Sequence, residues 1–77
     1  MEKGIKKVMS AVFGIDESAI DEATSPDIIE TWDSLRHMTL IIALEEEFSI
    51  QFDDAEIAEM INLQRIRTAI EKKVSNI

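Results

Sequence analysis

The sequence predicts an all-α fold, an antiparallel bundle of three main helices and one short helix with a long first loop. Three segments carry apolar residues at three- and four-residue steps, which is the spacing of one helix face. A turn signal centred on Pro26 separates the first segment from the second. Residues 49–52 hold too few β-branched and aromatic residues for a strand. A chain of 77 residues is expected to form a single domain, residues 1–77.

Charge is distributed unevenly along the chain. The formal net charge is −8, yet 45% of the residues are hydrophobic, which favours a folded domain over a disordered acidic tail. Fourteen of the sixteen acidic residues lie in two runs, 16–33 and 45–59, and the basic residues lie mainly near the two ends. Such a field repels nucleic acid and anionic membranes and attracts basic protein surfaces. We therefore expect a monomer with protein partners and no nucleic-acid partner.

Several features are missing from the sequence. It has no cysteine, so neither a disulfide framework nor a protein thiol is available. The first residues do not resemble a signal peptide, and no stretch approaches the roughly 20 apolar residues of a membrane span. A cytoplasmic protein without membrane insertion is expected.

The first helix is expected over residues 3–13 and the loop after it over residues 16–33. Gly14 suits a left-handed C-cap, with Ile15 making the accompanying apolar contact. Asp16 or Ser18 is expected to start a brief helical turn, and a loop of this length in a small domain is usually functional or mobile. The apolar face of the first helix is expected to consist of Ile5, Val8, Met9, Val12 and Phe13. The residues expected to hold the loop against the helices are Ile20, Ile28 and Ile29.

The central helix is expected to begin after Asp33 and to end at Phe48, and it carries two apolar arcs. One arc, made of Leu40, Ile41, Leu44 and Phe48, is sufficient for the core of a small domain. The other arc consists of Leu35, Met38 and Ile42 and is edged by Glu45 and Glu46. Spare apolar surface of this kind predicts a docking face for a partner protein.

Two further helices are expected after the central one. Asp53 or Asp54 can cap a short helix over about residues 55–60, with Ile57 and Met60 on its inner side. Asn62 is expected to cap the last helix, whose apolar stripe is Leu63, Ile66, Ile70 and Val74 and whose end carries Lys72 and Lys73.

The triplet Asp33-Ser34-Leu35, followed by the apolar helix and its acidic end Leu44-Glu-Glu-Glu-Phe48, resembles the phosphopantetheine attachment region of acyl carrier proteins. Residues 48–54 resemble that family's turn into a short third helix, and residues 62–70 resemble its last helix, so the resemblance covers nearly the whole chain. It implies that a phosphopantetheinyl transferase joins 4′-phosphopantetheine from coenzyme A to the Ser34 hydroxyl. The chain would then be a non-catalytic carrier of acyl groups as thioesters.

Ser34 also has a simpler interpretation, a helix N-cap that contributes about 1 kcal/mol. Asp33 can already serve as the cap, however, which leaves the Ser34 hydroxyl free beside backbone donors that suit a phosphate. The resemblance favours attachment, with Asp33, Leu35 and Trp32 beside the prosthetic group. Trp32 is expected either to pack on His37 at the helix entry or to form a lip beside the arm, and His37 is expected to be structural.

Partner enzymes that load and process the acyl group are expected to contact Leu35, Arg36, Met38, Ile42, Glu45 and Glu46. Fatty-acid carriers of the family typically have acidic residues where this chain has Arg36 and Thr39. This departure favours a carrier in a specialised lipid, polyketide or secondary-metabolite pathway over service to the common fatty-acid enzymes.

Two alternatives remain open at the level of sequence, an acidic helical adaptor without a prosthetic group and an aminoacyl or peptidyl carrier. A metal site is not expected. Residues 16–27 have the length of an EF-hand loop, but Asp21 stands where its tight turn needs glycine and Pro26 lies inside it.

Overall fold

The computed structural model describes residues 2–74, in which every regular element is helical. The elements in chain order are α1 (Glu2–Phe13), the 3-10 turn η1 (Glu17–Ala19), α2 (Ser34–Phe48), α3 (Asp54–Glu59) and α4 (Leu63–Val74). The predicted fold class is confirmed: three main helices, one short helix and a long first loop. The predicted boundaries of the helices agree with these within one residue, and the last helix extends to Val74, the last member of its predicted stripe.

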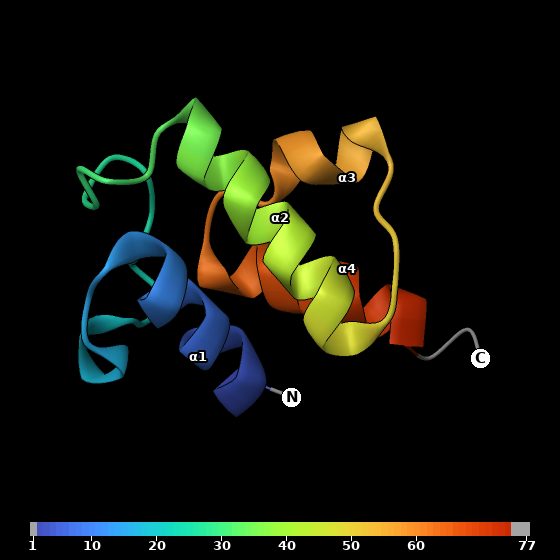
Figure 1. Cartoon of the computed structure of the whole chain (residues 1–77), viewed down its shortest axis with the longest axis horizontal. Coiled ribbons are helices and arrows are strands. Elements are labelled where there is room, and N and C mark those ends of the chain that lie inside the picture. Colours follow the sequence, from blue (N-terminus) through green and yellow to red (C-terminus); the bar gives the residue numbers. More distant parts are fainter. Residues whose placement is uncertain (1, 75–77) are drawn as a thin grey trace.

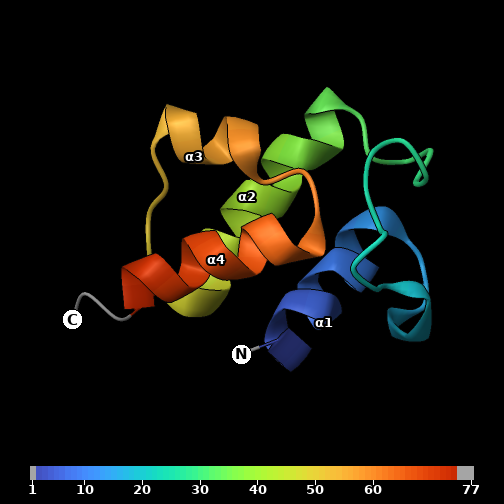
Figure 2. The same ribbon diagram turned by 180° about the vertical axis from the view of Figure 1, so that it is seen from behind.

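Helix α2 crosses the middle of the molecule, with α1 on one side and α4 behind it (Figure 1). Seen from behind, α4 lies in front of α2, and α1 and α3 lie on opposite sides of this pair (Figure 2). Helix α1 runs in the opposite direction to α2 and α4 (Figure 1). In both views the head of α2 lies between the long loop and α3, so these two segments flank the residues at the start of α2 (Figures 1 and 2).

One apolar core joins α1, α2 and α4. Its most deeply buried side chains come from all three helices and from the segments between them, and include Ile5, Met9, Phe13, Ile20, Leu40, Ile41, Leu44, Met60, Leu63, Ile66 and Ile70. Phe48 is only half-buried and packs on the edge of this core. Helices α1 and α2 approach closely there, because a Cβ atom on Gly4 would lie 3.3 Å from Cζ of Phe48. The predicted core arc of the central helix is thus confirmed for Leu40, Ile41 and Leu44, whereas Phe48 is half-buried and not buried.

Val74 is a correction to the predicted apolar stripe of the last helix. Its side chain is 41% exposed, whereas Leu63, Ile66 and Ile70 are buried as predicted. The last turn of α4 lies at the rim of the molecule, past the segments that cover the rest of the helix (Figure 2). Helical spacing identifies the face of a residue but cannot tell where along the helix the neighbouring elements stop.

The end of α1 has the predicted glycine cap. Gly14 has a φ of 68°, in the left-handed region, where glycine has no steric penalty. The Ser10 carbonyl accepts hydrogen bonds from the N–H groups of Gly14 at 2.9 Å and Ile15 at 3.3 Å. Ile15 packs against the core, as predicted.

The later helices begin at predicted caps. The Asp53 carboxylate accepts from the Glu56 N–H at 2.8 Å, and Glu56 accepts from the Asp53 N–H at 2.9 Å, which completes a capping box for α3. The Asn62 side-chain oxygen accepts from the Arg65 N–H at 2.8 Å at the start of α4. Short polar side chains therefore fix both starting points.

The long first loop is held at several points. Asp16 caps η1 by accepting from the Ser18 N–H at 3.1 Å, and hydrogen bonds from the Ser18 backbone and then its side chain lower the pKa of Asp16. The buried Thr24 hydroxyl accepts from the Asp21 N–H at 2.9 Å, a contact that the sequence analysis did not anticipate. Thr31 donates to the carbonyl of Phe13 at 3.0 Å.

Ile28 is the second correction. Ile20 is buried and Ile29 half-buried against the core, but Ile28 is 62% exposed. The N–H groups of Ile28 and Ile29 both donate to the Ser25 carbonyl within one turn. Adjacent residues of a turn point in different directions, so only Ile29 faces the core.

Arg67 of α4 connects the first helix and the loop to the last helix. It forms ion pairs with Glu2 and with Glu22, the latter at 2.9 Å. The hydrogen bonds to Glu22 and then Glu2 raise the pKa of Arg67. Because these pairs are open to water, each contributes little to the stability of the fold.

Candidate functional site

The head of α2 places Ser34 beside a cap that does not involve its hydroxyl. Asp33 has extended backbone angles, and its carboxylate accepts from the Arg36 N–H at 2.8 Å. Ser34 is the first residue of the helix and is exposed. Its hydroxyl has no hydrogen-bond partner within residues 2–74. The serine side chain is therefore free for chemistry, because Asp33 already caps the helix.

A cavity of about 540 Å³ opens beside Ser34. The long loop and the head of α2 form one wall, and Ala58 near the end of α3 and Ile61 in the connection after it form the other. The lining residues are Pro26, Trp32, Asp33, Ser34, His37, Met38, Ala58 and Ile61. The cavity is open to solvent and mostly apolar, so it can receive the apolar part of a chain attached at its rim.

Trp32 and His37 form part of the wall of this cavity. The Trp32 indole is 5% exposed, stacks on Phe13 with ring centroids 4.6 Å apart, and donates from Nε1 to Nδ1 of His37 at 2.9 Å. The His37 Nε2 atom lies 2.8 Å from the carbonyl oxygen of Ile57. The predicted packing of Trp32 on His37 is observed, and Trp32 also borders the cavity. Both partners of the His37 ring agree with a structural role.

The outer face of α2 carries the predicted apolar arc. Leu35, Met38 and Ile42 are 75%, 45% and 53% exposed. Glu46 is also exposed, whereas Glu45 is half-buried and its carboxylate accepts from the Phe52 N–H at 2.9 Å. The apolar arc is thus available to a partner, while Glu45 also holds the connection that follows α2.

Arg36 has an intramolecular partner that the sequence did not indicate. Its guanidinium donates to the carbonyl of Val12, in the last turn of α1, where the helix dipole favours a positive charge. Thr39 donates to the Leu35 carbonyl one turn earlier at 3.1 Å. The positive charge next to Ser34 is therefore tied to α1, and no spacing rule connects residues so distant in the chain.

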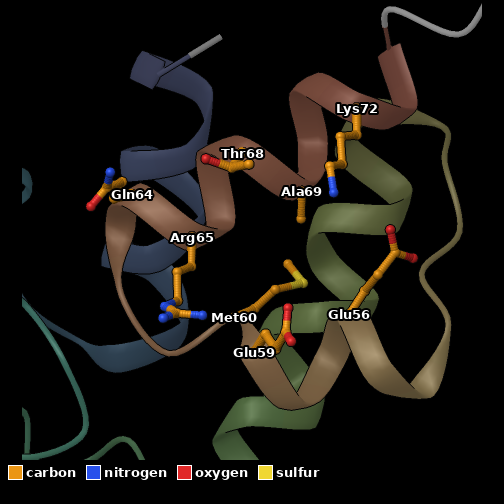
Figure 3. Close-up of a pocket in the computed structure, with 8 residues that line it drawn as sticks. All are labelled: Glu56, Glu59, Met60, Gln64, Arg65, Thr68, Ala69 and Lys72. Atoms are coloured by element: carbon orange, nitrogen blue, oxygen red, sulfur yellow. The ribbon is translucent and has the colours of Figure 1, made fainter.

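A second concavity, of about 240 Å³, lies between α3 and α4 and does not include Ser34 (Figure 3). Met60 and Ala69 are buried at its base, and Arg65 and Lys72 of α4 face Glu59 and Glu56 of α3 across it (Figure 3). Glu56 is bound to Lys73 at 2.9 Å as well as to the start of α3. This mixed-charge groove was not singled out by the sequence analysis.

Residues 2–74 contain no group of three or more His, Cys, Asp or Glu side chains that could hold a metal ion. None of the helices in this range is both long enough and apolar enough to cross a membrane.

Comparison with known proteins gives consistent relatives, although no protein-family model matches the chain. It is 36% identical to an acyl carrier protein of Buchnera aphidicola over 96% of this chain and 95% of that protein. It is 34% identical to an acyl carrier protein of Thermotoga maritima over 91% of this chain and 86% of that protein. The polyketide-8 synthase acyl carrier protein 1 of Streptomyces avermitilis is 28% identical, over 94% of this chain and 86% of that protein.

A solved structure has the same fold. The solution NMR structure of the holo acyl carrier protein from Geobacter metallireducens superposes with a TM-score of 0.85 at 29% sequence identity. The match covers 97% of this chain and 86% of that one.

Proposed function

The chain belongs to the acyl carrier protein family, and from this membership we propose that it carries acyl groups as thioesters on a 4′-phosphopantetheine arm attached to Ser34. The observation that carries the assignment of the residue is the exposed Ser34 hydroxyl, left free by the Asp33 cap at the edge of an open cavity. The arm, when attached, supplies a terminal thiol, which a chain without cysteine lacks. The chain itself would be the substrate of partner enzymes and would catalyse nothing.

The residues at the head of α2 fit a phosphodiester on Ser34. The backbone N–H of Arg36 is taken by the Asp33 side chain and that of His37 by the Asp33 carbonyl. The N–H groups of Ser34 and Leu35 have no partner within residues 2–74. These donors and the positive end of the helix dipole favour an anionic group at this position.

We propose a specialised lipid, polyketide or secondary-metabolite pathway for this carrier. Arg36 and Thr39 support the proposal, because they put a cation and a neutral residue beside Ser34 where acidic residues would attract the common fatty-acid enzymes. The match to a polyketide synthase carrier is compatible with such a pathway but does not identify it. A single domain over residues 1–77, the monomeric state and a cytoplasmic location remain predictions.

The partners of this site are a phosphopantetheinyl transferase and the enzymes that load and process the acyl group. We propose that they dock on Leu35, Met38 and Ile42, with Glu46 at the edge of that surface. Exposure of three apolar side chains on one helix face supports this assignment.

Attachment is tested by incubating the apo protein with coenzyme A and a promiscuous phosphopantetheinyl transferase and measuring intact mass. The wild-type chain should gain one phosphopantetheine, and Ser34→Ala should gain none while keeping the helical circular dichroism spectrum. Ser18→Ala, which removes another exposed hydroxyl, is the matched control and should load normally. Loading of Ser34→Ala would move the attachment point elsewhere, and a folded wild type that never gains mass would favour the adaptor alternative.

A further inference from the structure

The hydrogen bonds around His37 determine which of its ring nitrogens carries the proton. An indole N–H can only donate, so Nδ1 of His37, 2.9 Å from Trp32 Nε1, must be the acceptor. In the neutral ring the proton is then on Nε2, which donates to the Ile57 carbonyl oxygen at 2.8 Å. The two hydrogen bonds thus run in one direction, from the Trp32 indole to His37 and from His37 to the Ile57 carbonyl, and we call these three groups the relay. The bond from Trp32 fixes the orientation of the His37 ring, and this orientation directs Nε2 at the Ile57 carbonyl.

The first end of the relay is rigidly placed. Trp32 is almost fully buried, and its ring stacks on Phe13 at the end of α1. The neighbouring Thr31 is also bound to the Phe13 carbonyl. The loop immediately before Ser34 is thus anchored to α1, and Trp32 cannot turn away from His37 without losing its stacking.

The other end of the relay is α3, the shortest α-helix of the described residues. Helix α3 has only six residues, too few to be stable without tertiary contacts. The Ile57 carbonyl lies in its last turn and accepts from the Met60 N–H at 3.3 Å as well as from His37. Within residues 2–74, the His37 bond is the one side-chain hydrogen bond between α2 and α3.

Two residues of the relay belong to the wall of the cavity beside Ser34. Trp32 and His37 line it from the side of α2, and Ala58 and Ile61 line it from α3 and the residues after it. Any displacement of α3 relative to the head of α2 changes the separation of these two walls. We propose that Trp32 and His37 are positioning residues that hold α3 at the head of α2 and thereby set the width of the cavity beside Ser34. The use of that cavity by a group on Ser34 rests on the proposed function.

The direct test is hydrogen exchange of α3 amides in the apo protein, together with the nitrogen chemical shifts of the single histidine. The wild-type ring should show a protonated Nε2 and an unprotonated Nδ1. Trp32→Phe keeps an aromatic ring against Phe13 but loses the N–H donor, and His37→Leu loses both bonds of the relay. His37→Leu removes the bond to α3 and should speed exchange there on the order of five-fold, the effect of one hydrogen bond, whereas Trp32→Phe only frees the ring orientation and should have a smaller effect; the core amides of α4 should be unchanged in both.

Two further variants separate positioning from general stabilisation. His37→Gln places an amide donor near the former Nε2 and should recover part of the α3 protection lost in His37→Leu. Thr31→Val removes the bond from Thr31 to the Phe13 carbonyl in the same loop but leaves the stacking of Trp32 and both hydrogen bonds of His37 in place, so it should leave α3 exchange close to that of the wild type. A ring protonated on Nδ1, equal exchange in His37→Leu and Thr31→Val, or no recovery by His37→Gln would overturn the proposal.

The consequence for the site is measured by transferase kinetics. His37→Leu should raise the KM for loading several-fold while kcat stays within about two-fold, because neither relay residue contacts the Ser34 hydroxyl but α3 borders its surroundings. An unchanged KM with a loosened α3 would show that the cavity is not used. If the wild type never loads, the proposed function fails, and the exchange and tautomer results still decide the positioning role.

Discussion

The two faces of α2 belong to one helix of fifteen residues but differ in burial. On the inner face Leu40, Ile41 and Leu44 are at most 1% exposed. On the outer face the apolar side chains of Leu35, Met38 and Ile42 are about half exposed or more, as given above. The inner face stabilises the fold by removing apolar surface from water, whereas the outer face leaves about half or more of its apolar side-chain surface in water. The same residue types therefore differ in their contribution to stability, according to whether the rest of the molecule covers them.

The largest contrast is expected between truncations on the two faces. Leu44→Ala should lower the free energy of unfolding by about 2–5 kcal/mol, because it leaves a cavity in the core. Ile42→Ala should change it by less than about 1 kcal/mol, because about half of that side chain is in water already. Urea denaturation monitored by circular dichroism measures both. Equal destabilisation by the two variants would refute the distinction between the faces.

A smaller effect is expected when the outer face is truncated, and it should fall on loading by the transferase and not on stability. Met38→Ala should leave the free energy of unfolding nearly unchanged but lower kcat/KM for loading by roughly five- to thirty-fold, since interface truncations of this kind cost about 1–2 kcal/mol. Val74→Ala is the matched control, because it trims an exposed apolar side chain that lies on α4 and not on the outer face of α2. A similar loss in both variants would mean that apolar exposure alone, and not this face, determines loading.

The smallest effect is expected from the charge at the head of the outer face. The double variant Arg36→Asp with Thr39→Glu should raise turnover by general fatty-acid synthesis enzymes a few-fold, since single exposed charge contacts are worth at most about 1 kcal/mol. The control, Arg36→Gln with Thr39→Gln, alters the bond to Val12 without adding negative charge. The gain should be larger at low salt than at high salt. An equal gain in both double variants, or one indifferent to salt, would exclude an electrostatic cause.

The sequence predicted the parts of the structure that depend on local rules. Helix starts at Asp33, Asp53 and Asn62 follow from one side chain bonding to a nearby backbone N–H, and the stop at Gly14 follows from its access to positive φ. The two faces of α2 follow from helical periodicity alone. Attachment at Ser34 was inferred from a motif and is supported, though not tested, by the free hydroxyl that the structure describes.

The remaining features depend on contacts between segments distant in the chain. The Arg36 bond to Val12 spans 24 residues and the His37 bond to Ile57 spans 20, so no local pattern could indicate either. Ile28 and Ile29 are the same residue type in the same turn, and only the path of the loop decides which one is buried. The pairing of Trp32 with His37 could be suggested in advance because they lie five residues apart around a helix start.

The bond between Arg36 and Val12 gives the proposed docking surface a thermodynamic link to the first helix. A partner that draws the Arg36 guanidinium into its own interface must first break this bond, so its apparent affinity is lowered by the free energy of the contact, about 1–2 kcal/mol for a hydrogen bond of a charged donor at a partly buried position. By reciprocity, anything that loosens the end of α1 releases Arg36 and strengthens the same partner by an equal factor. Under the proposed function, partner selectivity at the Ser34 end is then coupled to the stability of the end of α1.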